Sequence, residues 1–275
     1  MPSISAATRD TARPQPAPRL GSAYRFVATV GGLACRLAGR RDWRGADHFP
    51  QRGGYITAVN HTSAFDPFVY GYFQYRNGLP PRFLIKSSLF RRPVIGPLLR
   101  AAGQIPVERA SARAARALDV AREALADGQC VAVYPEGTLT RDPDLWPGPA
   151  KTGVARLALM SGAPVVPVAQ WGAHLFVPPY GRGGRRVRFL PRPTFVVAVG
   201  PPVDLSDLYD REPTAAVLHE AGTRITTAII GLLEDIRGER YPGRATEDGT
   251  HRTARPCGPT GSATGSASAS GAPAQ

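Results

Sequence analysis

Residues 55–67 read YITAVNHTSAFDP, a short apolar run followed by polar residues that can carry chemistry. The first five residues have the β-branched and aromatic composition of a buried strand. Asp66 followed by Pro67 is typical of a helix start, so the residues between form a predicted strand-to-helix loop. Such loops often hold catalytic side chains, and this one contains His61 and Asp66.

Working outward from this stretch, short apolar runs alternate with helical patterns. Strands are predicted at residues 55–59, 82–85, 104–107, 130–134, 165–169, 187–190 and 195–199. Helices are predicted at residues 67–75, 112–126, 152–160 and 213–237, with Ser111 as the cap of the second and Gly128 as its stop. The alternation indicates an α/β domain, which we expect to hold a mixed, largely parallel sheet flanked by helices.

Composition separates one folded region from two polar ends. Residues 1–19 are rich in Pro, Ala, Ser and Arg, and residues 241–275 contain almost no large apolar side chain. Segments of this kind bury too little apolar surface to offset their ordering entropy. We therefore predict a disordered N-terminus at 1–19, one domain at 20–240 and a disordered tail at 241–275. Three scattered cysteines without C-x-x-C spacing favour a reducing compartment.

The charge of the chain calls for an anionic partner. The formal net charge is +13, and all but two of the 34 basic residues are arginine, the exceptions being Lys86 and Lys151. Nucleic acid, an acidic membrane and a phosphorylated substrate all satisfy such a charge. From Arg76 to Arg109 the only acidic residue is Glu108, so this stretch should attract phosphate. The sequence contains no signature of a known nucleic-acid-binding module, so we expect no nucleic-acid partner.

The N-terminal part of the domain predicts an amphipathic helix at residues 20–41. The chain contains no apolar run of 18 residues, so no membrane-spanning helix is predicted. One side of the predicted helix is apolar and the other carries the polar residues; the apolar residues are Leu20, Tyr24, Val27, Val30, Ala34 and Leu37, and the polar ones are Arg25, Thr29, Arg36 and Arg40. This pattern is typical of a helix in the headgroup layer of an anionic membrane, and equally of a core-facing helix in a soluble domain.

The pairing of His61 with Asp66 suggests base catalysis. An imidazole with an ordinary pKa of about 6.5 accepts a proton near neutrality, and a carboxylate can fix its tautomer and stabilise the imidazolium. The sequence lacks a G-x-S-x-G nucleophile elbow, so the base is expected to activate a substrate hydroxyl. The alternative is structural, with Asp66 capping a helix and His61 hydrogen-bonded in a turn. The other histidines have no clustered ligand partners, and we expect no metal.

Four segments together resemble a known enzyme family. They are residues 60–66 (NHTSAFD), 103–109 (GQIPVER), 134–138 (YPEGT) and 163–168 (APVVPV). In this order and at these spacings they closely resemble the four blocks of the glycerophospholipid acyltransferases, which include the 1-acylglycerol-3-phosphate acyltransferases. The resemblance extends over about residues 20–240.

The resemblance implies a role for each matching residue. It makes His61 the general base and Asp66 its orienting carboxylate, and it associates the fourth block with the acyl-donor side. The residues that it implies for substrate binding are Asn60, Lys86, Arg109, Glu136, Gly137, Thr138, Arg141 and Lys151. One position departs from the family, because the third block commonly ends in arginine and position 139 is leucine. Either Arg141 replaces that contact, or Lys86, Arg109 and Lys151 hold the anionic group.

The implied reaction moves a fatty acyl group from acyl-CoA or acyl carrier protein to the free hydroxyl of 1-acylglycerol 3-phosphate, giving phosphatidic acid. Glycerol 3-phosphate, another lysolipid or a glycolipid is the alternative acceptor, and a non-enzymatic lipid- or nucleic-acid-binding protein is the alternative outside catalysis. No cofactor is expected beyond the acyl thioester as co-substrate. The expected location is the cytoplasmic face of the cell membrane, as a peripheral or monotopic protein.

Overall fold

A computed structural model describes residues 21–78, 80–108, 113–179, 187–188 and 190–243. The chain divides into two units, residues 1–239 and residues 240–275. In the second unit the described part, residues 240–243, contains a short helical turn at Pro242 and Gly243. The predicted disordered ends therefore lie almost entirely outside the described residues and stay predictions.

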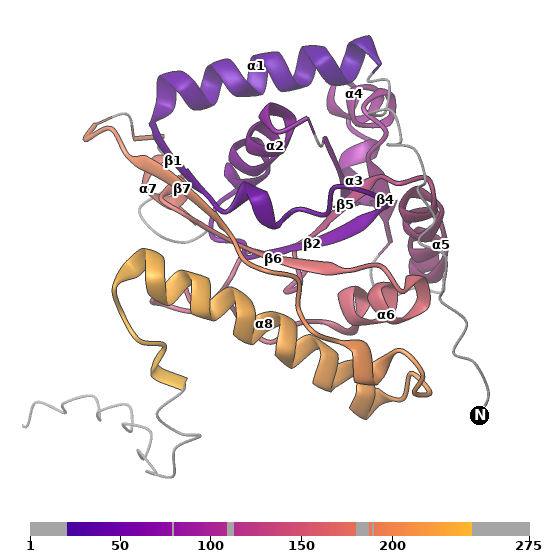
Figure 1. The fold of residues 1–275 in the computed structure, drawn as a ribbon. Helices are drawn as coiled ribbons and strands as arrows, with labels where there is room; N and C mark the ends of the chain where they lie inside the picture. The colour runs from indigo at the N-terminus through magenta and orange to yellow at the C-terminus, as the bar shows by residue number, and fades with distance from the viewer. Residues whose placement is uncertain (1–20, 79, 109–112, 180–186, 189, 244–275) are drawn as a thin grey trace, which may run out of the picture. The chain divides into compact units, whose positions relative to one another are not determined.

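The first unit is built on a seven-stranded sheet (Figure 1). In chain order its strands are β1 (Arg40–Arg44), β2 (Tyr55–Val59), β3 (Pro81–Lys86), β4 (Ile105–Val107), β5 (Cys130–Val133), β6 (Val165–Trp171) and β7 (Thr194–Val199). The spatial order is β1-β7-β6-β2-β5-β3-β4. Every neighbouring pair is parallel except β6 with β7, which confirms the prediction of a mixed, largely parallel sheet.

Helices cover both faces of this sheet, with α1 and α2 on one face and α5, α6 and α8 on the other (Figure 1). The helices are α1 (Ser22–Ala38), α2 (Asp66–Arg76), α3 (Ser87–Phe90), α4 (Ile95–Ala101), α5 (Arg113–Ala126), α6 (Thr152–Ser161), α7 (Ala173–Phe176) and α8 (Ala215–Arg237), with 3₁₀ turns η1 (Ala46–His48) and η2 (Ser206–Leu208). Strand β2 is buried along its whole length. A strand covered on both faces needs a continuous apolar run, which the sequence supplies.

Most predicted elements are present, but one predicted strand is wrong and one real strand was missed. Val187, Arg188 and Leu190 are exposed and adopt no strand conformation. Val187 and Leu190 suggested a buried strand by their apolar character, but both side chains are exposed. Conversely, β1 pairs with β7 at the edge of the sheet, and its sequence RRDWR shows no apolar run. Edge strands commonly carry charged residues, so an apolar pattern cannot reveal them.

The start of one predicted helix changes, and the end of another is confirmed. The C-terminal helix begins at Ala215 instead of residue 213, because Thr214 is the N-cap and its hydroxyl accepts a hydrogen bond from the Val217 amide at 3.4 Å. Helix α5 ends at Ala126, close to the stop predicted at Gly128, which adopts a φ of 76°. The cap predicted at Ser111 lies outside the described residues.

Helix α1 forms where predicted, but the two sides of the helix are not those expected. Its buried residues are small, namely Gly31, Gly32, Cys35 and Ala38, whereas the large side chains Phe26, Val30, Leu33 and Leu37 are 51–69% exposed. Tyr24 and Val27, predicted to share a face with Val30 and Leu37, are half-buried, and Arg40 belongs to β1.

The reason for this arrangement is the close approach of α2. A Cβ atom added at Gly32 would lie 2.5 Å from the Tyr72 ring, so only glycine allows the two helices to pack at this distance. Small residues on α1 therefore face α2, and the large apolar residues are left on the outside. No helix among the described residues is long and apolar enough to cross a membrane.

Candidate functional site

The loop between β2 and α2 brings His61 and Asp66 together, as predicted. The His61 Nδ1 atom lies 3.0 Å from Asp66 Oδ2, and the two side chains are 17% and 0% exposed. A carboxylate only accepts hydrogen bonds, so Nδ1 carries the proton in this contact. The other ring nitrogen, Nε2, then holds the free lone pair that a general base needs.

The same carboxylate closes the loop around the histidine. Asp66 Oδ2 also accepts hydrogen bonds from the backbone amides of Thr62 at 2.6 Å and Ser63 at 2.7 Å. The N-cap of α2 is Phe65, and no side chain caps this helix. The structural alternative, in which Asp66 serves as an N-cap, is therefore wrong. The carboxylate turns back into the loop because three donors converge on one of its oxygens.

A second set of hydrogen bonds fixes the start of the loop to β6. The Asn60 side chain donates to the Gln170 carbonyl at 3.0 Å and accepts from the Gln170 amide at 2.7 Å. In return the Gln170 side-chain amide donates to the Asn60 carbonyl at 3.1 Å. Both residues are about 1% exposed. Asn60 thus holds the histidine loop in place from the neighbouring strand.

An aromatic ring holds the imidazole from its face. The Tyr134 ring, at the end of β5, stacks on the His61 ring with centroids 4.0 Å apart and an interplanar angle of 19°. On its other side Phe83 lies parallel to Tyr134 at 6.1 Å and 11°. Together with Asp66, this stack limits rotation of the imidazole about its side-chain bonds.

Glu136 lies two residues further along the chain and shares the surroundings of His61. Burial raises the pKa of this carboxyl group to about 7, and the hydrogen bond from the Gly148 amide, with smaller effects of nearby Thr140 and His61, counteracts the rise only in part. Oε2 accepts from the Gly148 amide at 3.0 Å, whereas buried Oε1 has no hydrogen-bond partner among the described residues. Glu136 is therefore a carboxyl group that titrates close to neutral pH.

The third predicted segment continues into a loop that brings Lys151 close. Gly137 adopts a φ of 67°, in the left-handed region that favours glycine. A Cβ atom at this position would lie 3.4 Å from Lys151 Nζ, so the lysine ammonium group packs directly against the glycine. Two residues that the sequence analysis assigned to substrate binding are thus neighbours.

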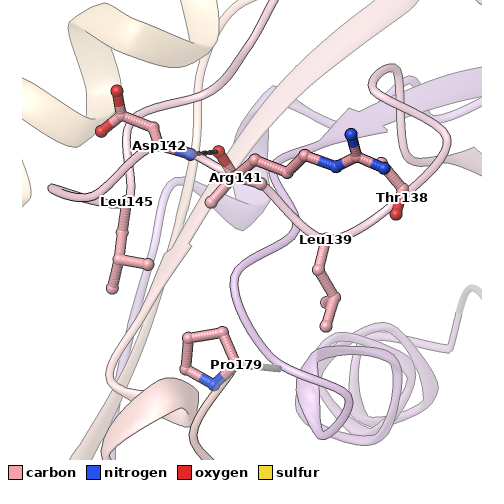
Figure 2. A pocket seen from close by; sticks show the side chains of 7 residues that line it. Thr138, Leu139, Arg141, Asp142, Leu145 and Pro179 are labelled. Carbon is pink, nitrogen blue, oxygen red and sulfur yellow. Dashed lines mark hydrogen bonds between the residues drawn. The ribbon is translucent and has the colours of Figure 1, made fainter. Parts of the chain in front are cut away.

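A pocket opens beside this loop, lined by residues 138–142, Leu145 and Pro179 and with a volume of about 370 Å³ (Figure 2). We call it the loop pocket. The Thr140 amide donates to the His61 carbonyl at 2.8 Å, which joins the wall of the loop pocket to the histidine loop. Figure 2 shows the exposed Arg141 side chain extending in the direction of Thr138. The predicted residues Thr138 and Arg141 therefore line one pocket.

One predicted phosphate contact, Lys86, is not brought into this cluster. Lys86 is the exposed last residue of β3, and β5 lies between β3 and the histidine-bearing β2. Because the three strands are parallel, Lys86 lies at the same edge of the sheet as His61, two strands away. Arg109 lies outside the described residues, so its predicted contact remains a prediction.

Two contacts of the site were not predicted from sequence, namely Gln170 with Asn60 and Tyr134 stacked on His61. Neither residue belongs to a pattern that spacing could reveal, because their contacts with Asn60 and His61 join separate strands. The only signal available was the position of each residue at the end of an apolar run, where parallel strands of one sheet place their following residues together. Among the described residues no group of three or more potential ligands gathers to hold a metal ion.

Comparison with known proteins adds independent information. Residues 40–171, which include His61, Asp66, Glu136 and Gln170, match the family model described as Acyltransferase. A 1-acyl-sn-glycerol-3-phosphate acyltransferase of Borreliella burgdorferi is 32% identical over 133 residues, or 48% of this chain and 51% of that protein. A protein of the same name from Limnanthes douglasii is 30% identical over 192 residues, 69% of this chain and 63% of that protein.

The chain thus spans between half and two thirds of the length of these two relatives. A solved structure shares the fold: the crystal structure of the 1-acyl-sn-glycerophosphate acyltransferase PlsC from Thermotoga maritima matches with a TM-score of 0.56. That match covers 76% of this chain and 79% of the other, at 22% sequence identity.

Proposed function

We propose that this chain, which matches the Acyltransferase family model over residues 40–171, transfers a fatty acyl group from an acyl thioester to the free hydroxyl of 1-acylglycerol 3-phosphate. The observation that carries the proposal is the contact of 3.0 Å between His61 Nδ1 and the buried Asp66 carboxylate. This pair supplies a base with a fixed tautomer, and the relatives' names supply the acceptor. The carrier of the acyl group is coenzyme A or acyl carrier protein.

In the proposed reaction His61 Nε2 takes the proton from the acceptor hydroxyl as its oxygen attacks the thioester carbonyl. The resulting tetrahedral intermediate collapses, the carbon–sulfur bond breaks, and the thiolate leaves with the electron pair. A thiol has a pKa of about 8.5, so the thiolate needs little protonation to depart. The Asp66 carboxylate stabilises the imidazolium that forms, and the imidazolium returns its proton to the thiolate or to water.

The acceptor's phosphate is proposed to bind on the side of the loop pocket. Arg141 lines this pocket, and Lys151 Nζ lies beside Gly137. A charge-assisted hydrogen bond to phosphate contributes about 1.5–3 kcal/mol, and arginine binds phosphate with two parallel bonds. Since position 139 is leucine, we assign to Arg141 the contact that the family's usual arginine would make. Lys86 is proposed to add positive charge at the same sheet edge, and Arg109 stays a predicted phosphate contact outside the described residues.

We further propose that the protein works at the surface of an anionic membrane. Helix α1 exposes Phe26, Val30, Leu33 and Leu37, and Arg25 and Arg36 on the same helix are also exposed. Apolar side chains next to arginines match the acyl boundary and the anionic headgroups of a bilayer. The scattered cysteines fit a reducing compartment, so we propose the cytoplasmic face of the cell membrane.

Vesicle binding tests the membrane proposal. We expect the protein to co-sediment with vesicles of phosphatidylcholine and phosphatidylglycerol, and less with phosphatidylcholine alone. Leu33→Asp should lower partitioning about tenfold, since burying one leucine side chain contributes about 1.5–3 kcal/mol. Met160→Asp is the matched control, because Met160 is 44% exposed on α6, on the other face of the sheet. Equal partitioning of the two variants would contradict the role of α1.

The acceptor is tested by incubating the purified chain with a labelled acyl thioester and a panel of acceptors. The panel comprises 1-acylglycerol 3-phosphate, glycerol 3-phosphate, a lysophosphatidylcholine and a glycolipid, each offered with an acyl-CoA and with an acylated carrier protein. We expect labelled phosphatidic acid from the first acceptor. Transfer to a different acceptor would show that the proposed acceptor is wrong. Salt-dependent retention on DNA without any transfer would overturn the proposed function.

A further inference from the structure

A buried arginine joins three distant parts of the chain next to the loop pocket. Arg237 is the last residue of α8, and its guanidinium carbon lies 3.9 Å from the ring centroid of Trp146 and 4.5 Å from that of Trp171. The Arg237 side chain is only 8% exposed. It donates to the Asp144 carbonyl at 2.8 Å and pairs with Glu239 at 2.7 Å. We call Trp146, Arg237 and Trp171 the aromatic clamp.

The chemistry of the aromatic clamp requires arginine. A planar guanidinium stacks on aromatic rings and is more weakly hydrated than an ammonium group, so it tolerates burial against two rings. A lysine ammonium group is compact and strongly hydrated, and it has no plane to stack. The side chain at position 237 therefore does more than pair with a carboxylate.

One ring of the aromatic clamp is connected to the wall of the loop pocket. The Trp146 carbonyl accepts from the Thr140 hydroxyl at 2.6 Å, and the Trp146 amide donates to Asp142 at 3.1 Å. Leu145, the residue before Trp146, lines the pocket and adopts a φ of 64°. A non-glycine residue in this region is strained and persists only when its surroundings hold it. The contact of Trp146 with Arg237 is part of those surroundings.

The other ring is connected to the histidine loop. Trp171 directly follows Gln170, which makes three hydrogen bonds with Asn60, the residue before His61. The Thr140 amide, on the pocket side, donates to the His61 carbonyl. Arg237 thus lies between the two segments whose relative position decides how far the loop pocket is from the imidazole.

We propose that Arg237 is a positioning residue that sets the wall of the loop pocket relative to His61 and so determines how tightly the acceptor binds. The inference rests on the proposed function, which assigns the acceptor to this pocket. Arg237 touches neither His61 nor Asp66 among the contacts of the described residues, so its effect is expected on the acceptor and not on the base. Acyl-thioester binding is expected to stay as it is.

The test compares Arg237→Met and Arg237→Lys with the wild-type chain. For each protein, kcat and KM are measured for transfer to 1-acylglycerol 3-phosphate, together with thioester hydrolysis without acceptor. Both variants should raise the acceptor KM about tenfold, the effect of losing a desolvated cation–π contact. The donor KM and the hydrolysis rate should change less than about twofold. Quenching of tryptophan fluorescence by acrylamide should increase, since Trp146 is 3% exposed in the intact protein.

Two control variants separate the aromatic clamp from general effects on α8. Arg224 lies on α8 like Arg237, and Arg224→Met removes its ion pairs with Asp207 and Glu220. Glu239→Gln removes the carboxylate partner of Arg237 and leaves both rings in place. Neither change should alter the acceptor KM or the quenching.

The outcomes are separable. An unchanged acceptor KM in Arg237→Met, or full recovery in Arg237→Lys, would overturn the inference. So would an equal loss of transfer and hydrolysis with a lower melting temperature, because that pattern describes a residue needed only for folding. If the wild-type protein transfers no acyl group to any acceptor of the panel, the proposed function itself fails, and this inference fails with it.

Discussion

The histidine loop (residues 60–66) and the pocket loop (residues 134–151) differ in where their main contacts come from. In residues 60–66 the Asp66 carboxylate collects its three donors from within five positions of the sequence. In residues 134–151 two contacts reach distant segments. The Tyr134 ring stacks on the His61 ring, and the Trp146 ring packs against Arg237 at the end of α8. The contact between His61 and Asp66 is thus made within one short segment, whereas the pocket loop also depends on contacts with distant segments. Under the proposed function, the base then depends mainly on a short motif and acceptor binding on several parts of the domain.

Replacing His61 should have the largest effect, and it should lower transfer without weakening acceptor binding. His61→Ala removes the base, and general-base catalysis contributes about 10²–10⁴-fold, so we expect transfer to fall by about 10²–10⁴-fold. Binding of the acceptor, measured by equilibrium dialysis with a non-transferable thioester present, should change little. Transfer within tenfold of wild type would show that another group acts as the base.

Replacing Asp66 tests whether its carboxylate orients the His61 imidazole and stabilises the imidazolium. In Asp66→Asn the amide keeps one oxygen for the Thr62 and Ser63 amides but no longer stabilises an imidazolium at His61. We expect kcat to fall about 10²-fold or more, as removal of an orienting carboxylate does in catalytic triads. Steady-state kinetics and a thermal melt on the same preparation distinguish this from unfolding. A change in the acceptor KM alone would contradict the assignment.

Changing the charge in the pocket loop should have a smaller effect, on the acceptor only. Arg141→Ala removes a cation from the loop pocket, and the loss of one charge-assisted hydrogen bond predicts a rise in the acceptor KM of about tenfold. Leu139→Arg in the same background restores the residue common in the family and should recover part of the loss. If Arg141→Ala leaves the acceptor KM unchanged while Lys151→Ala raises it, Lys151 is the phosphate contact.

Glu136 predicts a pH dependence of stability within the pocket loop. Burial raises its pKa from 4.5 to about 7 in the folded protein, so between these values the folded state binds the proton and the unfolded state does not. This contribution to stability is complete below pH 4.5 and is lost as the pH rises through 7. The melting temperature of Glu136→Gln minus that of the wild type should therefore increase as the pH is raised from 5 to 8. A constant difference across this range would contradict the raised pKa.

The central strands of the sheet and the contact of His61 with Asp66 were predictable from sequence because their determinants are local. The apolar run at 55–59 marks a strand that is buried on both faces, and Asp66-Pro67 marks the helix that follows it. The spacing of His61 and Asp66 is short enough for the loop itself to bring them together. Edge strand β1 was missed for the opposite reason, since its register with β7 is set by a partner about 150 residues away.

The pocket side of the site was only partly predictable. Glu136, Gly137, Thr138 and Lys151 were named on a resemblance, and the contact of Lys151 with Gly137 depends on the course of the whole loop between them. Apart from the position of Gln170 at the end of an apolar run, Gln170 and Arg237 carry no sequence signal, because a glutamine in a strand and an arginine near a helix end are both common. Their contacts with Asn60 and with Trp171 appear only in the folded structure.

The close packing of Gly32 against the Tyr72 ring has a mechanical consequence. An added Cβ atom at position 32 would lie 2.5 Å from the ring, so only glycine lets α1 come this close to α2. The first residue of α2 is Asp66, so α1 packs on the helix that carries the partner of His61. A bulkier side chain at position 32 is therefore expected to push α1 away from that helix.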